Sequence, residues 1–553
     1  MTAPVLDRSD PVLVEQIVRR AGRPDFDRWA EQVERCGHCS RPVRLRGYIE
    51  RADGSSYSTD SEPDRVLLKR CGNRRASVCP SCSYEYAGDM WQLLYAGAAG
   101  GRKGVPESIR SHPLVFATLT APGFGPVHGT RTGSGSARCR PPRGKPALCA
   151  HGRPTWCTRV HGEDDPRLGE PLCADCYDYA GHAAFNWWAP ELWRRFTITL
   201  RRVLARRAGL TPAAFSRRCR LSFVKVAEFQ RRAVVHFHAL IRLDAAGEGY
   251  RLSDVPLGAG ELADAVREAA LLVRFTAPLP RSLPPATAEH LGFNHDQPHE
   301  SGRQDEVDPP GERGGPGSAV QAIDEPLGQQ RQPHQPEHDT RAGAEHLAQS
   351  GPVSRGAHQR TVPANQDVSL CFGKQVDVQP INGDTDGDLT PKRAAAYIAK
   401  YATKSAEDFG LGDRRLTGPA LAGDGVTPHV ARLVRTCWAL GDLDEYAGIR
   451  KWIHMAGFRG HFASKSRRYS TTLGAIRGER QTFRRRQAAE HARQLGLDPI
   501  DENTTLVVSR WEFTGLGYLT AGDAALALSA AARARERRDA ARDESPTDPG
   551  ENP

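Results

Sequence analysis

Two histidines separated by one hydrophobic residue, His236-Phe237-His238, constrain the fold of this chain more than any other feature. Successive side chains of a strand point to opposite faces, so a strand here places both imidazoles on one face and Phe237 on the other. Two imidazoles on one face can share a divalent metal ion. We therefore expect a strand near residues 234–243 with a metal site on one side.

The preceding segment predicts that this strand is one half of a hairpin. Residues 221–230 and 234–243 are rich in β-branched and aromatic residues, and the short turn Arg231-Arg232-Ala233 separates them. A three-residue loop puts Glu228 directly opposite His236, whereas a two-residue loop would put it on the wrong face. Histidine plus carboxylate suits Mg²⁺ or Mn²⁺, although imidazole alone would equally accept zinc. Glu228 is thus a third candidate ligand.

A second segment predicts a helix that carries two tyrosines. Thr390 is a good N-cap, and the helix should span about residues 391–408. Tyr397 and Tyr401 are four residues apart, so they project from one face. The structural alternative for such a pair is that both tyrosine rings simply pack the helix against its neighbours.

Lys400 and Lys404 flank the tyrosine face, close enough to bind a scissile phosphate or to favour a phenolate. A phenol is a poor nucleophile at neutral pH unless a cation or a metal stabilises its anion. In-line attack on DNA would leave a 5′-phosphotyrosine on the protein and a free 3′-hydroxyl on the DNA. Together with the candidate metal site, these residues suit metal-assisted phosphodiester transesterification by tyrosine.

Three ordered motifs resemble those of HUH-superfamily rolling-circle replication initiators: the strand 116–120, the His-hydrophobic-His strand and the Tyr-x-x-Lys-Tyr helix. The wider sequence is similar to the RepSA-type initiators of actinomycete plasmids and integrative elements, notably in residues 226–230, 171–179 and 460–470. The resemblance covers most of residues 30–540.

The resemblance implies an enzyme that nicks and rejoins DNA at a plasmid origin, with His236 and His238 as metal ligands. In relatives with a single tyrosine, the position matching Tyr401 tends to be the nucleophile, so Tyr401 is the first choice and Tyr397 the second. Ala233 stands where we expect a glycine. The alternatives are an HUH transposase or conjugative relaxase, and a non-enzymatic, zinc-containing DNA-binding regulator.

The charge balance favours a polyanionic partner, because 76 Lys and Arg residues face 66 Asp and Glu residues. We expect origin DNA, single-stranded at the nick, to contact Lys404, Lys465, Arg467 and Arg468. The sequence has no Gly-x4-Gly-Lys-Ser/Thr loop, so a host helicase and a DNA polymerase would extend the 3′ end.

Thirteen cysteines are present, most of them in groups. Neither a secretory signal nor a run of membrane-spanning length is evident, so we expect a cytoplasmic protein with no membrane partner, in which cysteines bind structural Zn²⁺ rather than form disulfides. The first candidate set is Cys36, Cys39, Cys79 and Cys82, with Cys71 spare. The second is Cys149, Cys157, Cys173 and Cys176, with Cys139, His151 and His161 as alternatives.

These features predict an α+β protein: an antiparallel-sheet HUH nuclease domain, with the histidines at the centre of the sheet and the tyrosine helix packed across it, accompanied by zinc-binding cysteine modules and a long disordered insertion. The expected order is a helical lead (1–30), a cysteine module (31–110), the first nuclease part (111–283, with the second cysteine module at 139–176), the disordered insertion (284–368), the second nuclease part (369–415), a basic C-terminal region (416–542) and a disordered tail (543–553).

Overall fold

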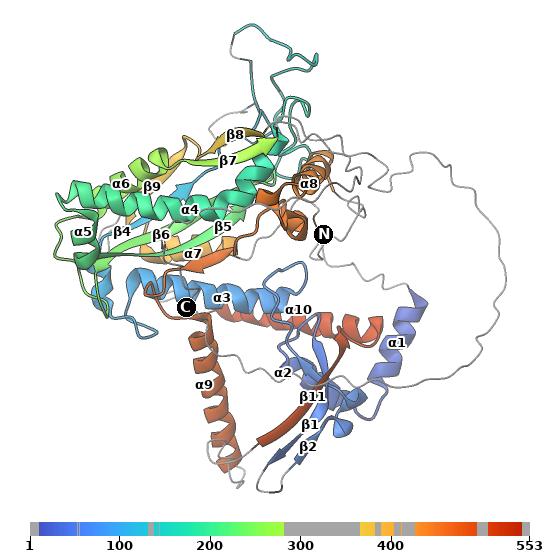
Figure 1. The fold of residues 1–553 in the computed structure, drawn as a ribbon. Helices are drawn as coiled ribbons and strands as arrows, with labels where there is room; N and C mark the ends of the chain where they lie inside the picture. Colours follow the sequence, from blue (N-terminus) through green and yellow to red (C-terminus); the bar gives the residue numbers. More distant parts are fainter. Residues whose placement is uncertain are drawn as a thin grey trace, which may run out of the picture. The chain divides into compact units, whose positions relative to one another are not determined.

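The computed structural model describes residues 10–51, 54, 56–130, 138–142, 144–280, 365–381, 389–402, 411, 426–494 and 507–544. These residues form a mixture of helices and antiparallel sheets (Figure 1), which confirms the α+β class. The helices are α1 (Pro11–Ala21), α2 (Phe26–Arg35), α3 (Pro80–Ala99), α4 (Tyr179–Arg207), α5 (Pro212–Arg218), α6 (Ala259–Leu272), α7 (Pro391–Ala402), α8 (Pro428–Leu440), α9 (Leu473–Gln494) and α10 (Ala521–Glu544). The strands are β1 (Val43–Arg51), β2 (Ser56–Ser58), β3 (Leu67–Lys69), β4 (Leu114–Leu119), β5 (Cys219–Phe229), β6 (Val235–Ala245), β7 (Phe275–Pro280), β8 (Asn365–Leu370), β9 (Val376–Ile381), β10 (Ala463–Lys465) and β11 (Val507–Leu516).

A five-stranded antiparallel sheet in the order β10-β5-β6-β4-β9 forms the centre of the fold. The histidine strand β6 is its middle strand, as the sequence predicts. In the β5–β6 hairpin, Glu228 pairs with His236, which confirms the register expected for a three-residue loop. Ala233 closes this loop in the left-handed conformation (φ 62°), the region that favours glycine. Its carbonyl oxygen accepts a hydrogen bond from Asn186 of α4 (3.0 Å), which holds the turn in place.

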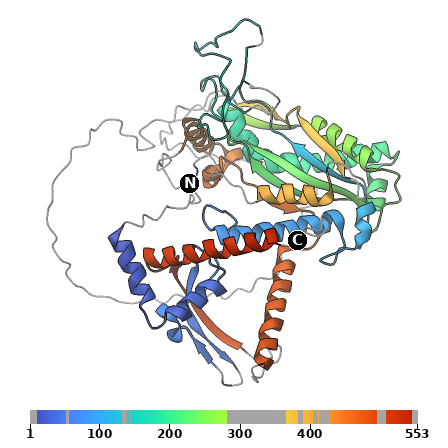
Figure 2. The same ribbon diagram turned by 180° about the vertical axis from the view of Figure 1, so that it is seen from behind.

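Helices cover both faces of this sheet. On one face, Phe237 and Ile241 of β6 belong to a hydrophobic core that includes Phe196 and Leu200 of α4. On the other face, Val224 and Val226 of β5 pack in a second core with residues of α3 and α7, among them Leu94 and Ile398. Figures 1 and 2 show α4 and α6 on one side of the sheet and α7, with α3 beyond it, on the other. The tyrosine helix therefore packs across the sheet, as predicted.

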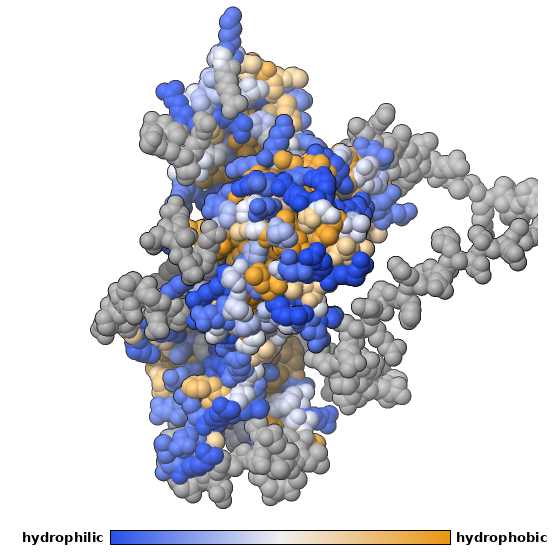
Figure 3. Space-filling model, turned by 90° about the vertical axis from the view of Figure 1, so that its left-hand side faces the viewer, coloured by the Kyte–Doolittle hydropathy of each residue, from blue (hydrophilic) through white to orange (hydrophobic). Residues whose placement is uncertain are grey.

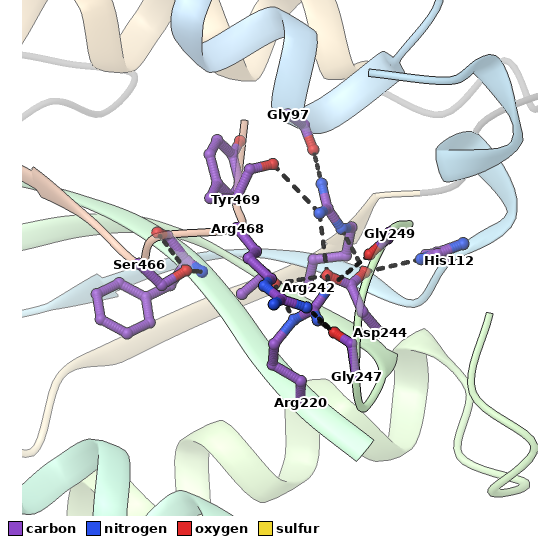
Figure 4. Close-up of polar contacts among 12 residues, drawn as sticks. Gly97, His112, Arg220, Arg242, Asp244, Gly247, Gly249, Ser466, Arg468 and Tyr469 are labelled. Atoms are coloured by element: carbon purple, nitrogen blue, oxygen red, sulfur yellow. Dashed lines mark hydrogen bonds and ion pairs between the residues drawn. The ribbon is translucent and has the colours of Figure 1, made fainter. Parts of the chain in front are cut away.

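A buried ion pair anchors the end of β6 farther from the histidines (Figure 4). The guanidinium of Arg242 donates to both carboxylate oxygens of Asp244, at 2.7 and 3.0 Å. It also donates to the carbonyl oxygens of Gly97 in α3 and Tyr469, the latter at 3.2 Å. Burial alone would raise the pKa of Asp244, but hydrogen bonds from His112 and Arg242 hold it below its usual range. One charge pair thus joins β6 to α3 and to the segment before α9.

A second sheet joins the two ends of the described chain. Strand β1 pairs with β2 and β3, and along its other edge with β11. Arg20 of α1, only 5% exposed, makes ion pairs with Asp64 (2.7 Å) and with Asp523 of α10 (2.6 Å). Segments expected to belong to the cysteine module and to the basic C-terminal region therefore share one sheet and one buried charge cluster.

Several expected boundaries fall on residues that the structure does not describe. The expected disordered insertion lies outside the described residues, except that 365–368 belong to β8. The expected helix end at residue 408 also lies outside them, because α7 is described only as far as Ala402. Within the described part of the chain, none of the helices is both long enough and hydrophobic enough to cross a bilayer. Hydrophilic residues cover much of the face drawn in Figure 3, with hydrophobic residues interspersed.

Candidate active site

The two histidines and Glu228 meet on the α7 side of the central sheet. Nε2 of His236 lies 2.8 Å from Oε2 of Glu228, and Nε2 of His238 lies 2.9 Å from the same oxygen. His238 is almost fully buried, and the other two side chains are largely buried. Burial alone would raise the pKa of Glu228, but the hydrogen bonds from the histidines outweigh it and lower the pKa to about 2. The carboxylate is therefore ionised at neutral pH.

This triad has the composition and the spacing of a divalent metal site. An octahedral ion with metal–oxygen distances of about 2.0–2.1 Å has neighbouring ligand atoms about 2.9–3.0 Å apart. The two nitrogen–oxygen distances in the triad, 2.8 and 2.9 Å, are close to that value. Two imidazoles and one carboxylate leave coordination positions open for a substrate oxygen. The residues present therefore fit Mg²⁺ or Mn²⁺.

Helix α7 places both tyrosines against the histidines. The ring of Tyr401 stacks on His238 with centroids 4.9 Å apart, and the ring of Tyr397 meets the same imidazole edge-on at 5.4 Å. The two tyrosine rings are 4.7 Å apart. Tyr397 is 43% exposed, whereas Tyr401 is more buried. Two segments more than 150 residues apart in sequence thus bring two phenols and a candidate metal-binding triad to one place.

The predicted catalytic lysine, Lys400, and the predicted DNA-contacting residues have different surroundings. Lys400 is exposed on α7, and Lys404 lies outside the described residues. Lys465 donates to the carbonyl oxygens of Arg467 (3.2 Å) and Ser470 (3.1 Å), so its ammonium group binds its own loop. Arg468 donates to the carbonyl oxygen of Gly247 and faces Glu248. Arg467 is exposed.

Two residues of the predicted strand 116–120, which is β4 in the structure, contact the same histidine, and no role was predicted for either of them. Thr118 pairs with His238 across the sheet, and its Oγ1 lies 3.1 Å from Nδ1 of that ring. Phe116 packs against both His238 and Tyr397. In the structure Nε2 of His238 bonds Glu228, whereas with a metal ion at Nε2 the ring proton would sit on Nδ1 and be donated to Thr118, which would orient the ring. This contact depends on the antiparallel pairing of β4 with β6, which the motif at 116–120 does not itself specify.

We expect Thr118→Val to lower the affinity for Mn²⁺ about 10-fold to 100-fold, because a hydrogen bond that orients a metal-binding histidine is lost. Calorimetric titration of the protein with Mn²⁺ would measure the change. Thr120→Val is the matched control, because it removes a hydroxyl that donates instead to the carbonyl oxygen of Gln375 (2.6 Å). Equal affinities in the two variants would contradict the role assigned to Thr118.

The first cysteine cluster differs from the predicted set by one residue. The structure brings together Cys39, Cys71, Cys79 and Cys82, so that Cys71 takes the place predicted for Cys36. The Sγ atoms of Cys79 and Cys82 each lie 3.7 Å from that of Cys39, close to the edge of about 3.8 Å in a tetrahedral Zn–thiolate site. Cys36 caps the C-terminal end of helix α2 and packs beside the cluster, but its thiol donates to the carbonyl oxygen of Val33 and is not one of the four grouped ligands.

The second predicted set also differs from the observed cluster. Cys149, Cys173 and Cys176 lie together, and the fourth member is His151, which was an alternative in the sequence prediction. Nδ1 of His151 lies 3.3 Å from Sγ of Cys176 and 3.8 Å from Sγ of Cys173. Cys157 is instead 3.5 Å from His161. Its backbone pairs with that of Arg140, which places it in a different part of the same segment.

Comparison with known proteins gives a consistent result over nearly the whole chain. The family model described as RepSA, replication initiator protein, pSAM2, matches residues 25–309 and 315–532. A curated replication initiator protein of Streptomyces ambofaciens is 37% identical over 543 residues, covering 97% of this chain and 96% of that relative. No solved structure matches the chain.

Proposed function

This chain belongs to the RepSA family of replication initiator proteins, and from that premise we propose that it starts rolling-circle replication by nicking one strand at a plasmid origin. The observation that carries the proposal is the contact of both Tyr397 and Tyr401 with His238 inside the metal triad. A phenol beside a bound divalent ion would lie where attack on a phosphodiester requires the nucleophile.

In this proposal Tyr401 attacks the scissile phosphorus. A bond forms between its phenolic oxygen and phosphorus, the bond from phosphorus to the 3′ oxygen breaks, and the phenolic proton ends through solvent on the departing 3′-hydroxyl. The product is a 5′-phosphotyrosine and a 3′-hydroxyl primer. A bound Mg²⁺ or Mn²⁺ would withdraw charge from the phosphate oxygens. Glu228, His236 and His238 would hold this ion, and Lys400, exposed on α7, would attract the DNA backbone.

Rejoining reverses the same chemistry. A free 3′-hydroxyl attacks the phosphotyrosine, a phosphodiester forms, and the phenol is released. Tyr397 would perform the second transesterification at termination, because its ring is beside that of Tyr401 and need not move to another site. The scissile DNA would be single-stranded here, because the largely buried triad lies between the sheet and α7. A host helicase and a DNA polymerase would then extend the primer.

The Cys39/Cys71/Cys79/Cys82 cluster and the Cys149/His151/Cys173/Cys176 cluster are proposed as structural Zn²⁺ sites. The first has four thiols, and the second has three thiols and one imidazole, both common zinc ligand sets. Each ties together segments that are distant along the chain or poor in regular secondary structure. Bound zinc therefore contributes directly to folding there.

The test is to incubate the purified full-length chain with a supercoiled plasmid carrying its own origin, with Mg²⁺ or Mn²⁺. We expect one strand to be nicked at one position in the origin, with protein attached covalently to the 5′ end, and no reaction in EDTA. A plasmid without the origin is the control. Nicks at the ends of an integrated element instead would identify a transposase, and specific binding without any adduct would identify a non-enzymatic regulator.

A further inference from the structure

We propose that His128, Cys139, Cys157 and His161 bind a further Zn²⁺ ion, at a site separate from the two cysteine clusters described above. One ligand atom from each of these four residues lies within 4.8 Å of the others. Two thiols and two imidazoles are a common zinc set, and three of the four residues are buried. The inference concerns structure and does not depend on the proposed DNA chemistry.

Three distances among the ligand atoms are close to those of a tetrahedral zinc site. With Zn–N about 2.0–2.1 Å and Zn–S about 2.3 Å, neighbouring nitrogens are about 3.3 Å apart, and nitrogen and sulfur about 3.6 Å. Here Nδ1 of His128 is 3.1 Å from Nε2 of His161. Nε2 of His161 is 3.5 Å from Sγ of Cys157, and Nδ1 of His128 is 3.9 Å from Sγ of Cys139.

The groups around these ligands are arranged as around a bound metal. Nδ1 of His161 lies 2.7 Å from the carboxylate of Asp165, which directs Nε2 into the cluster. Arg167 in turn holds this carboxylate with an ion pair of 2.8 Å. The backbone N–H of Gly129 donates to Sγ of Cys139 (3.3 Å), the kind of bond that stabilises a thiolate. A histidine oriented by a carboxylate is a frequent feature of zinc sites.

The segment that contains the site has little else to hold it. Between the end of β4 and the start of α4, the described residues form only isolated bridges, without a helix or a strand. The backbone of His128 nevertheless exchanges hydrogen bonds with Gly169 (2.9 Å) and Glu170 (2.8 Å). A Cβ added to Gly169 would lie 2.6 Å from the backbone of Arg231, in the turn that precedes the histidine strand. Zinc at His128 would therefore fix a segment that packs against this turn.

The experiment counts zinc per chain by mass spectrometry of the metal, in full-length protein carrying His238→Ala so that the triad does not contribute. We expect three zinc ions in this parent and two in each of Cys139→Ser and Cys157→Ser. Cys219→Ser is the matched control, because Cys219 is a buried cysteine outside the candidate metal groups of the described residues, and it should keep all three. Cys71→Ser should lose one ion from a different site.

A parent with only two ions, unchanged by Cys139→Ser, would overturn the proposal. If the serine variants do not fold, Asp165→Asn keeps all four ligands and removes only the charge that orients His161. It should release one zinc of three to a competing chelator about 10-fold to 100-fold more readily than the parent. Release of all three ions at the parental affinities would equally contradict the site. Nicking by the unmodified chain is not part of either measurement, so failure here leaves the proposed function untouched.

Discussion

Tyr401→Phe is expected to abolish the covalent protein–DNA adduct on a single-stranded origin oligonucleotide in the presence of Mg²⁺ or Mn²⁺. Phenylalanine keeps the ring that stacks on His238 and deletes only the nucleophilic oxygen, so a loss of adduct reports chemistry rather than folding. We expect a fall of at least about 10³-fold, as for other residues that form a covalent intermediate. Denaturing gels with labelled DNA would measure it.

Tyr397→Phe is the matched control, because its ring contacts the same imidazole from the same helix. It should nick once at near-normal rate and then accumulate products of failed termination. Normal termination in Tyr397→Phe would make that tyrosine structural. Adducts mapped by mass spectrometry to neither tyrosine would contradict the mechanism as a whole.

Loss of a metal ligand should be equally severe. We expect His236→Ala, His238→Ala and Glu228→Gln each to reduce nicking at least about 10³-fold, because the phosphate oxygens would lose the ion that withdraws their charge. Binding to duplex origin DNA should change little, since its base and phosphate contacts come mainly from other surfaces. Nicking assays and gel-shift titrations on the same preparations would separate the two effects.

Glu228→Gln is the most informative of these variants, because it preserves the size of a largely buried side chain while removing its charge. His461→Ala is the control for a histidine outside the metal-ligand groups of the described residues, and it is exposed. Full activity in Glu228→Gln would limit the ligand set to the two histidines. Nicking by the wild type that persists in EDTA would contradict the metal site itself.

The central part of the site was predictable because its determinants are local. The register of Glu228 against His236 follows from alternation along two strands and from the length of one turn. The common face of Tyr397 and Tyr401 follows from helical periodicity. That α7 would lie on the sheet face bearing the histidines was expected from the chemistry, because nucleophile and metal must face one phosphate, and no local sequence pattern specifies it.

The zinc ligands were less predictable, because a cysteine's partners depend on tertiary contacts. Cys36 has the right spacing from Cys39, but it ends α2 and points back to the carbonyl group of Val33. Cys71 lies in an irregular segment, and only the folded chain shows that it joins Cys39. His128 has no cysteine or histidine close to it in sequence on its N-terminal side, so spacing alone gave no reason to select it.

The pairing of β1 with β11 affects when this sheet can form during synthesis of the chain. Val43 is paired with Leu516 of β11, a strand that begins more than 450 residues later, so this sheet cannot close on the ribosome until β11 has emerged. The strands of the central sheet, in contrast, are all synthesised by residue 465. Until β11 arrives, β1 presents an unpaired edge that is open to other chains. Incomplete polypeptides would thus contain the nuclease sheet while lacking a finished N-terminal sheet, and they would be more prone to aggregation and to proteolysis than the full-length initiator.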